Sequence, residues 1–272
     1  MSTGPPGTGK TLVAKAVATE CGLPFLSVKG PELLGSYVGE SEANIRGIFE
    51  SAREAAARNI PITASILFFD ELDSLAPRRG NAGDGGGVME RVVATLFAEL
   101  DGPSSSSGVD HGTSRVFVMG ATNRPDLLDP SLLRPGRLDR LVYLGIPTGT
   151  EDRAHVLAAQ IRKLRLDRDP LDIARDVVST LPPNLTGADL STIGSGGLLK
   201  AVQRLCRQAD EEVRQSNDQL TLPHVLEGWD DDRRVPVVTL DDLIEAAREV
   251  VPSVSVKEME RYEKLRSQFS ST

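Results

Sequence analysis

Close to its start the sequence reads Gly4-Pro5-Pro6-Gly7-Thr8-Gly9-Lys10-Thr11, and this stretch decides the fold. Its spacing is that of a P-loop, in which glycines let successive backbone N–H groups point toward phosphate oxygens. The helix expected from Lys10 onward adds the positive end of its dipole. The alternative interpretation, a glycine-rich turn that matches by chance, is weakened by a second motif that a phosphate site requires.

The second motif is an apolar run, Ile66-Leu67-Phe68-Phe69, that ends in Asp70 and Glu71. A buried strand beside the P-loop would bring the Asp70 carboxylate and the Thr11 hydroxyl to Mg²⁺, with Glu71 as the base that polarises water and Lys10 on the β- and γ-phosphates. The alternative is that both acids only cap a strand end. The predicted cofactors are ATP and Mg²⁺, and the predicted nucleotide contacts here are Gly4, Pro5, Pro6, Gly7, Thr8, Gly9, Lys10, Thr11, Leu12 and Asp70.

The alternation of short apolar runs with helical periodicity predicts an α/β domain with a parallel sheet flanked by helices. We expect its strands near residues 25–28, 66–69, 116–120 and 141–144. Only three residues precede Gly4, so we expect the first central strand, which would enter the P-loop, to be missing and this domain, residues 1–148, to be truncated at its N-terminus.

Beyond residue 148 the pattern contains only helices, which predicts a small all-helical domain over residues 149–272. We expect its helices near residues 151–163, 171–178, 188–214 and 240–250. A polar, acidic stretch from about 210 to 236 is interpreted as a flexible surface loop. The last helix begins with a possible capping box, Ser255 and Glu258, and carries an apolar stripe that needs a packing partner.

Composition bears on the partners and the compartment. The chain has 31 Lys and Arg residues against 39 Asp and Glu residues, a net charge of -8. Nucleic-acid affinity comes largely from neutralising phosphates, so a nucleic-acid motor is disfavoured and a polypeptide substrate is expected. With no signal-peptide pattern and no bilayer-length apolar run, we expect no direct membrane insertion and a cytoplasmic location.

The third motif has two parts, Gly120-Ala121-Thr122-Asn123-Arg124-Pro125-Asp126 followed by Leu133 to Arg140. It resembles the second region of homology of the classical AAA ATPases. The resemblance implies a P-loop AAA+ fold and ATPase activity. It also implies that Asn123 is the polar sensor that helps to position water. Arg134 and Arg137 would be arginine fingers that reach a neighbouring subunit's nucleotide; the alternative is that they form surface ion pairs.

Further stretches fit the same family. Thr186-Gly187-Ala188-Asp189 resembles the start of the helical segment that closes over adenine and ribose, so Gly187 and Ala188 are implied as nucleotide contacts, while Thr186 can also cap its helix. Ser36-Tyr37-Val38-Gly39 resembles the pore loop, with Tyr37, Val38 and Gly39 as its gripping residues; the alternative is that Tyr37 is a half-buried packing residue. Residues 79–87 resemble the second pore loop. Asp101-Gly102 matches the intersubunit-signalling position, although Pro103 departs from it.

Residues 28–34, 79–89 and 252–255 narrow the resemblance to the second ATPase module of the peroxisome biogenesis members of this family. That resemblance implies a heterohexamer with a sister AAA ATPase, held by a membrane anchor protein at the peroxisomal membrane. Its polypeptide substrates would be ubiquitinated import receptors. Two alternatives stay open: another AAA unfoldase, or a nucleotide-binding scaffold without turnover.

Overall fold

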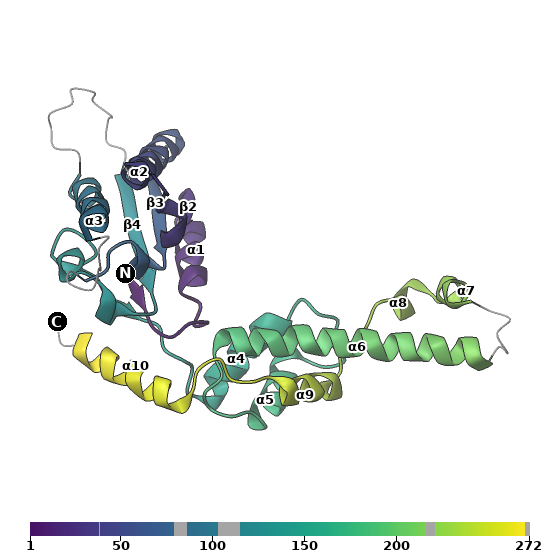
Figure 1. Cartoon of the computed structure of the whole chain (residues 1–272). Coiled ribbons are helices and arrows are strands. Elements are labelled where there is room, and N and C mark those ends of the chain that lie inside the picture. Colours follow the sequence, from purple (N-terminus) through teal and green to yellow (C-terminus); the bar gives the residue numbers. More distant parts are fainter. Residues whose placement is uncertain (38, 79–85, 103–114, 216–220, 270–272) are drawn as a thin grey trace. The chain divides into compact units, whose positions relative to one another are not determined.

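The computed structural model describes residues 1–37, 39–78, 86–102, 115–215 and 221–269 (Figure 1). It divides into two compact units. The first comprises Met1–Pro5, Gly9–Gly145 and Glu260–Thr272, and the second comprises Pro6–Thr8 and Ile146–Met259. The boundary at residue 148 stays a prediction, but the end of the chain groups with the first unit and not with the helical domain.

The first unit is built on a parallel sheet of five strands in the order β2-β3-β4-β1-β5. Its strands are β1 (Ser2–Thr3), β2 (Phe25–Lys29), β3 (Ala64–Asp70), β4 (Arg115–Thr122) and β5 (Val142–Tyr143). The helices that flank it are α1 (Lys10–Glu20), α2 (Glu40–Arg58) and α3 (Gly86–Leu100). The predicted α/β class is thus confirmed, and each of the four predicted strands forms.

Strand β3 is mostly apolar because helices cover both faces of the sheet. Leu67 and Phe69 belong to the core formed with α2 and α3, whereas Phe68 faces Ala14 of α1. All three strand side chains are fully buried. Burial of each large apolar side chain stabilises the fold by roughly 2–3 kcal/mol. The strand is therefore firmly held, and Asp70 projects from its carboxyl end.

The expectation that the first central strand is missing was wrong. Ser2 and Thr3 form β1 between β4 and β5, with Ser2 opposite Ala121 and Val142. The β5 side is fixed by backbone hydrogen bonds, including Leu144 N to Thr3 O at 2.8 Å. Two residues are enough because parallel neighbours satisfy their backbone groups on both sides. The P-loop begins directly after this strand, at Gly4.

The second unit is helical, as expected. Its helices are α4 (Thr150–Ile161), α5 (Pro170–Ser179), α6 (Gly187–Gln215), α7 (Leu222–Gly228), α8 (Asp231–Arg234), α9 (Leu240–Glu249) and the first turn of α10 (Val256–Phe269). Of the helices that the structure describes, none is both long and apolar enough to cross a membrane.

Glycines in α6 allow α9 to approach it closely. A Cβ at Gly197 would lie 2.4 Å from Leu243 Cδ2, and one at Gly196 would lie 2.9 Å from Ala246 Cβ. Glycine lowers helix propensity, yet α6 runs unbroken through both positions. Close packing against α9 therefore outweighs the intrinsic cost of glycine.

The interpretation of residues 210–236 as a flexible loop was wrong for the part that the structure describes; residues 216–220 lie outside it. Trp229 is 5% exposed and packs with Val225 and with Ala209 of α6. Its indole N–H donates to Glu212 at 3.0 Å, and the Arg233 guanidinium lies 4.1 Å above its ring. The contacts of one large aromatic side chain thus hold α7 and α8 against the end of α6. The average polarity of this stretch does not predict such contacts.

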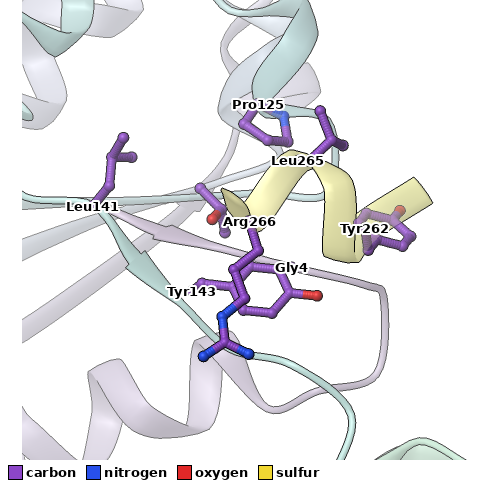
Figure 2. Close-up of a pocket in the computed structure, with 8 residues that line it drawn as sticks. Gly4, Pro125, Leu141, Tyr143, Tyr262, Leu265 and Arg266 are labelled. Atoms are coloured by element: carbon purple, nitrogen blue, oxygen red, sulfur yellow. The ribbon is translucent and has the colours of Figure 1, made fainter. Parts of the chain in front are cut away.

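The last helix, α10, begins with the predicted capping box, in which Ser255 N donates to Glu258 Oε2 at 2.9 Å and Glu258 N donates to Ser255 Oγ at 3.3 Å. From Glu260 onward it belongs to the first unit. There Arg261 pairs with Asp126 at 3.0 Å, and Tyr262 and Leu265 line the same small cavity as Tyr143 of β5 (Figure 2). Of the apolar stripe expected from the sequence, Tyr262 and Leu265 are half-buried in the first unit, whereas Val256 is exposed.

Candidate nucleotide site

The P-loop takes the backbone shape that its glycines permit. Gly4, Gly7 and Gly9 all have positive φ, at 143°, 73° and 87°, where a side chain is unfavourable. At Gly4 a Cβ would lie 2.0 Å from Leu144 O, so the backbone just after β5 requires glycine as well. Gly9 then caps α1, which begins at Lys10. The positive end of α1 thus opens at the P-loop.

Lys10 is buried, and its ammonium group is turned back onto the loop. Lys10 Nζ donates to Gly4 O at 3.0 Å and to Pro5 O at 2.6 Å. Burial lowers the pKa of Lys10 to about 8, although the nearby Asp70 carboxylate opposes the shift. A phosphate group could replace these two carbonyls as the partner of the ammonium.

Thr11 and Asp70, 59 positions apart in sequence, meet in the structure. Thr11 Oγ1 donates to Asp70 Oδ2 at 2.8 Å, while the other carboxylate oxygen accepts from Glu71 N at 3.0 Å. The sequence predicted both as metal ligands, and the fold brings their oxygens together. Leu12 follows on α1 and is 66% exposed.

Glu71 follows the last residue of β3 and has an unusual backbone conformation. Among the described residues it is the one non-glycine with positive φ, at 54°. Its carboxylate is exposed and has no hydrogen-bond partner within the part of the chain that the structure describes. The conformation turns the chain immediately after Asp70 into the short 3₁₀ helix Leu72–Ser74.

Asn123 follows the carboxyl end of β4. Its neighbour Thr122 donates to Asp73 Oδ1 at 2.6 Å and accepts from Arg124 N at 2.9 Å. This link joins the turn after Glu71 to the segment that carries Asn123. Sequence reasoning missed Asp73, because nothing in its spacing shows that it meets Thr122, 49 positions away.

The two arginines of the third motif differ. Arg134 is exposed and has no ion-pair partner among the described residues. Arg137 is held by Asp101 through two hydrogen bonds, of 2.7 and 2.6 Å, and lies 4.2 Å above the Phe97 ring. These bonds hold the pKa of Asp101 below its usual value. The surface-ion-pair alternative thus describes Arg137 within one subunit but not Arg134. Pro103 lies outside the described residues.

Within the second unit, the P-loop residue Gly7 contacts the start of α6. Ala188 N donates to Gly7 O at 3.0 Å, and a Cβ at Gly7 would lie 2.8 Å from Thr186 Oγ1. Thr186 also caps α6 in the sense expected, because Asp189 N donates to its Oγ1 at 3.2 Å. Gly187 and Ala188 therefore lie beside the backbone of Gly7.

Tyr37 is 80% exposed, which argues against the half-buried packing alternative. Its N–H donates to Glu40 Oε2 at 3.1 Å, and Gly39 precedes α2 with a φ of 88°. The loop is thereby tied to the first turn of α2 while the ring stays exposed. Val38, and residues 79–85 of the second predicted pore loop, lie outside the described residues.

A small cavity lies where α10 meets β5, with a volume of ≈ 60 Å³ (Figure 2). Gly4, Tyr143 and Leu265 are among its lining residues, and Arg266 lies 5.7 Å from the Tyr143 ring. Ligand pockets measure roughly 300–1,000 Å³, so this cavity is a packing gap behind the P-loop.

Comparison with known proteins places these features in a family. Residues 1–146 match the model of the ATPase family associated with various cellular activities (AAA). The chain is 47% identical over 270 residues to Peroxisomal ATPase PEX6 of Arthrobotrys oligospora, 48% over 268 residues to that of Mus musculus and 46% over 268 residues to that of Schizosaccharomyces pombe. Each alignment covers 98% of this chain but only 22%, 24% and 27% of the relative, so the chain spans about a quarter of their length. The P-loop, the β3 acids and the family match agree, and the chain belongs to the AAA family of ATPases.

Proposed function

We propose that this chain binds and hydrolyses ATP and that hydrolysis remodels polypeptide substrates. The observation that carries the proposal is the meeting of Thr11 Oγ1 and Asp70 Oδ2 at 2.8 Å, beside a P-loop whose lysine faces backbone carbonyls. Two distant stretches of sequence, residues 4–11 and the end of β3, would thus supply a phosphate cradle, the lysine ammonium and a pair of hard oxygen ligands.

The Thr11 and Asp70 oxygens fit Mg²⁺, because hydroxyl and carboxylate oxygens are ligands that this cation accepts and it commonly takes only one or two from the protein. When bound, Mg²⁺ would neutralise charge on the phosphate oxygens. Thr11 and Asp70 would then exchange their mutual hydrogen bond for the shared cation. The Asp70 oxygen that accepts from Glu71 N stays oriented by that bond.

The remaining roles follow from placement. Lys10 would pair with the β- and γ-phosphates, and Glu71, with a free and exposed carboxylate, would take a proton from the attacking water. Asn123 would orient that water. Gly187 and Ala188 would line the adenine and ribose.

Arg134 and Arg137 would act on the nucleotide of a neighbouring subunit, where a guanidinium stabilises the spread negative charge of the transition state. Arg134 is already free to do so. Arg137 would first have to exchange Asp101 for phosphate, so its contribution would depend on the neighbour.

The similarity to Peroxisomal ATPase PEX6 supports a more specific proposal. The chain would be the second ATPase module of a peroxin six type protein, in a heterohexamer with its sister ATPase peroxin one. Cytoplasmic and peripheral at the peroxisomal membrane, it would be held there by a membrane anchor protein and would extract ubiquitinated import receptors. The exposed ring of Tyr37 supports a grip on unfolded chain, because an aromatic side chain can contact many sequences.

The test is a comparison of ATP binding and hydrolysis in the unmodified chain and in Glu71→Gln. We expect binding to be kept and turnover to fall about 10²–10⁴-fold, because only the proton acceptor is lost. Lys10→Ala should instead lose nucleotide affinity. Binding without turnover in the unmodified chain, at every protein concentration, would favour a scaffold; full turnover in Glu71→Gln would refute the assigned base.

A further inference from the structure

The backbone of Glu71 is held by one residue of the turn that follows it. Ser74 Oγ donates to Glu71 O at 2.8 Å, and Ser74 N donates to the same oxygen at 3.0 Å. The carbonyl therefore accepts two hydrogen bonds from a single residue. Left-handed φ is unfavourable for a residue with a Cβ and persists only where the surroundings enforce it.

The neighbouring strand leaves room for this arrangement because a glycine follows its last residue. Lys29 of β2 pairs with Asp70 of β3, so Gly30 lies beside the Glu71 turn. A Cβ at Gly30 would be 2.1 Å from Ser74 Oγ and 2.6 Å from Glu71 O. Gly30 is buried and is not among the described glycines with positive φ, so the space and not the dihedral angle requires glycine.

This turn decides where the Glu71 carboxylate points. In a continued strand, side chains alternate, and Glu71 would face the side of the sheet opposite to Asp70. The left-handed residue ends the strand at Asp70 instead, and the Asp70 carboxylate faces Thr11. The direction of the Glu71 side chain thus depends on a conformation that Ser74 stabilises and that Gly30 permits.

We propose that Ser74 and Gly30 are positioning residues for Glu71: they keep its backbone left-handed and so aim its carboxylate at the attacking water. The inference rests on the proposed function, in which Glu71 is the base. Neither residue touches the nucleotide in this account.

The experiment uses Ser74→Ala and Gly30→Ala, each with a matched control. Ser179 Oγ donates to the carbonyl three residues earlier, Asp176 O, at 2.7 Å, so Ser179→Ala removes the same bond elsewhere. A Cβ added at Gly47 would have nothing within 4 Å, so Gly47→Ala adds a methyl group in open space. We expect the two test variants to lose roughly tenfold to a hundredfold in turnover at unchanged ATP affinity, and the controls to lose nothing.

Two further measurements separate positioning from general damage. In the Glu71→Gln background, Ser74→Ala should cause no further loss of turnover, because there is no base left to aim. In nucleotide-free protein, Ser74→Ala should accelerate hydrogen exchange of the Ser74 amide, whereas Ser179→Ala should not change it.

Unchanged turnover in Ser74→Ala, an equal loss in both backgrounds, or unchanged exchange of the Ser74 amide would each overturn the proposal. Failure of the proposed function has a different signature: Glu71→Gln keeps its turnover while Ser74→Ala still accelerates exchange.

Discussion

Raising the pH from 7 to 9 should weaken ATP binding about tenfold, because Lys10 loses its proton in this range. Burial lowers the Lys10 pKa to about 8 in the nucleotide-free protein, and the Asp70 carboxylate only partly offsets that shift. ATP binds the protonated form, and its phosphates raise the Lys10 pKa in the complex. Affinity is therefore full below pH 8 and declines above it.

The magnitude follows from the protonated fraction of Lys10. With a pKa of about 8 that fraction is roughly 0.9 at pH 7 and roughly 0.1 at pH 9, a tenfold change in the binding-competent form, or about 1.4 kcal/mol. Isothermal titration calorimetry at constant free Mg²⁺ measures the affinity. Above pH 8 it should also show proton uptake on binding.

Lys10→Arg is the matched control, because a guanidinium stays charged throughout this range. Its affinity, whatever its value at pH 7, should stay constant to pH 9. The reasoning is refuted if the unmodified protein binds ATP equally well at both pH values. A parallel decline in Lys10→Arg would equally refute it, since another group would then be titrating.

Further substitutions test the arginines, the exposed tyrosine and the packing of the helical unit. Arg134→Ala and Arg137→Ala should each lower ATP hydrolysis by the adjacent subunit in a mixed hexamer, and the double variant should lower it ~10³–10⁵-fold. Only Arg137→Ala should also lower the stability of its own chain, by roughly 1 kcal/mol, because it loses an ion pair and a ring contact. A loss of hydrolysis confined to the variant's own site would show that the arginines act in cis. Tyr37→Ala should leave the melting temperature and the basal ATPase rate unchanged, because Tyr37 is 80% exposed, but it should stop the processing of an unfolded polypeptide. Normal processing by this variant would contradict the assigned role of Tyr37. Gly197→Ala should destabilise the helical unit by about 1 kcal/mol, measured by urea titration. The new Cβ would lie 2.4 Å from Leu243, and this overlap costs about 1–3 kcal/mol, more than the gain of about 1 kcal/mol in helix propensity. A stabilised variant would contradict the packing argument.

The parts of the fold that the sequence predicts well are those set by local pattern. Apolar runs located β3 and its neighbours, and the glycine spacing located the P-loop, because each pattern follows from the geometry of one element. The two-residue β1 was missed for the converse reason. Ser2 and Thr3 carry no strand signal of their own, and it is pairing with Ala121 and Val142 that makes them a strand.

The candidate site divides in the same way. Residue types at fixed spacing pointed to Lys10, Thr11 and Asp70, and the structure brings the last two within hydrogen-bonding distance. The left-handed φ of Glu71 and the hydrogen bond from Ser74 depend on Gly30, which follows the adjacent strand, and no single segment encodes this arrangement. Long-range complementarity of this kind becomes visible only in three dimensions.

Trp229 has a spectroscopic consequence, because it is the sequence's only tryptophan and is buried against α6 in the second unit. Indole emission therefore reports the α6, α7 and α8 cluster, whereas circular dichroism in the far ultraviolet averages over the helices of both units. If the two signals give coincident denaturation curves, the units melt as one cooperative system; if they separate, the units melt independently. A single native fluorophore, with no label attached, can thus measure how far the two units of this chain depend on each other for stability.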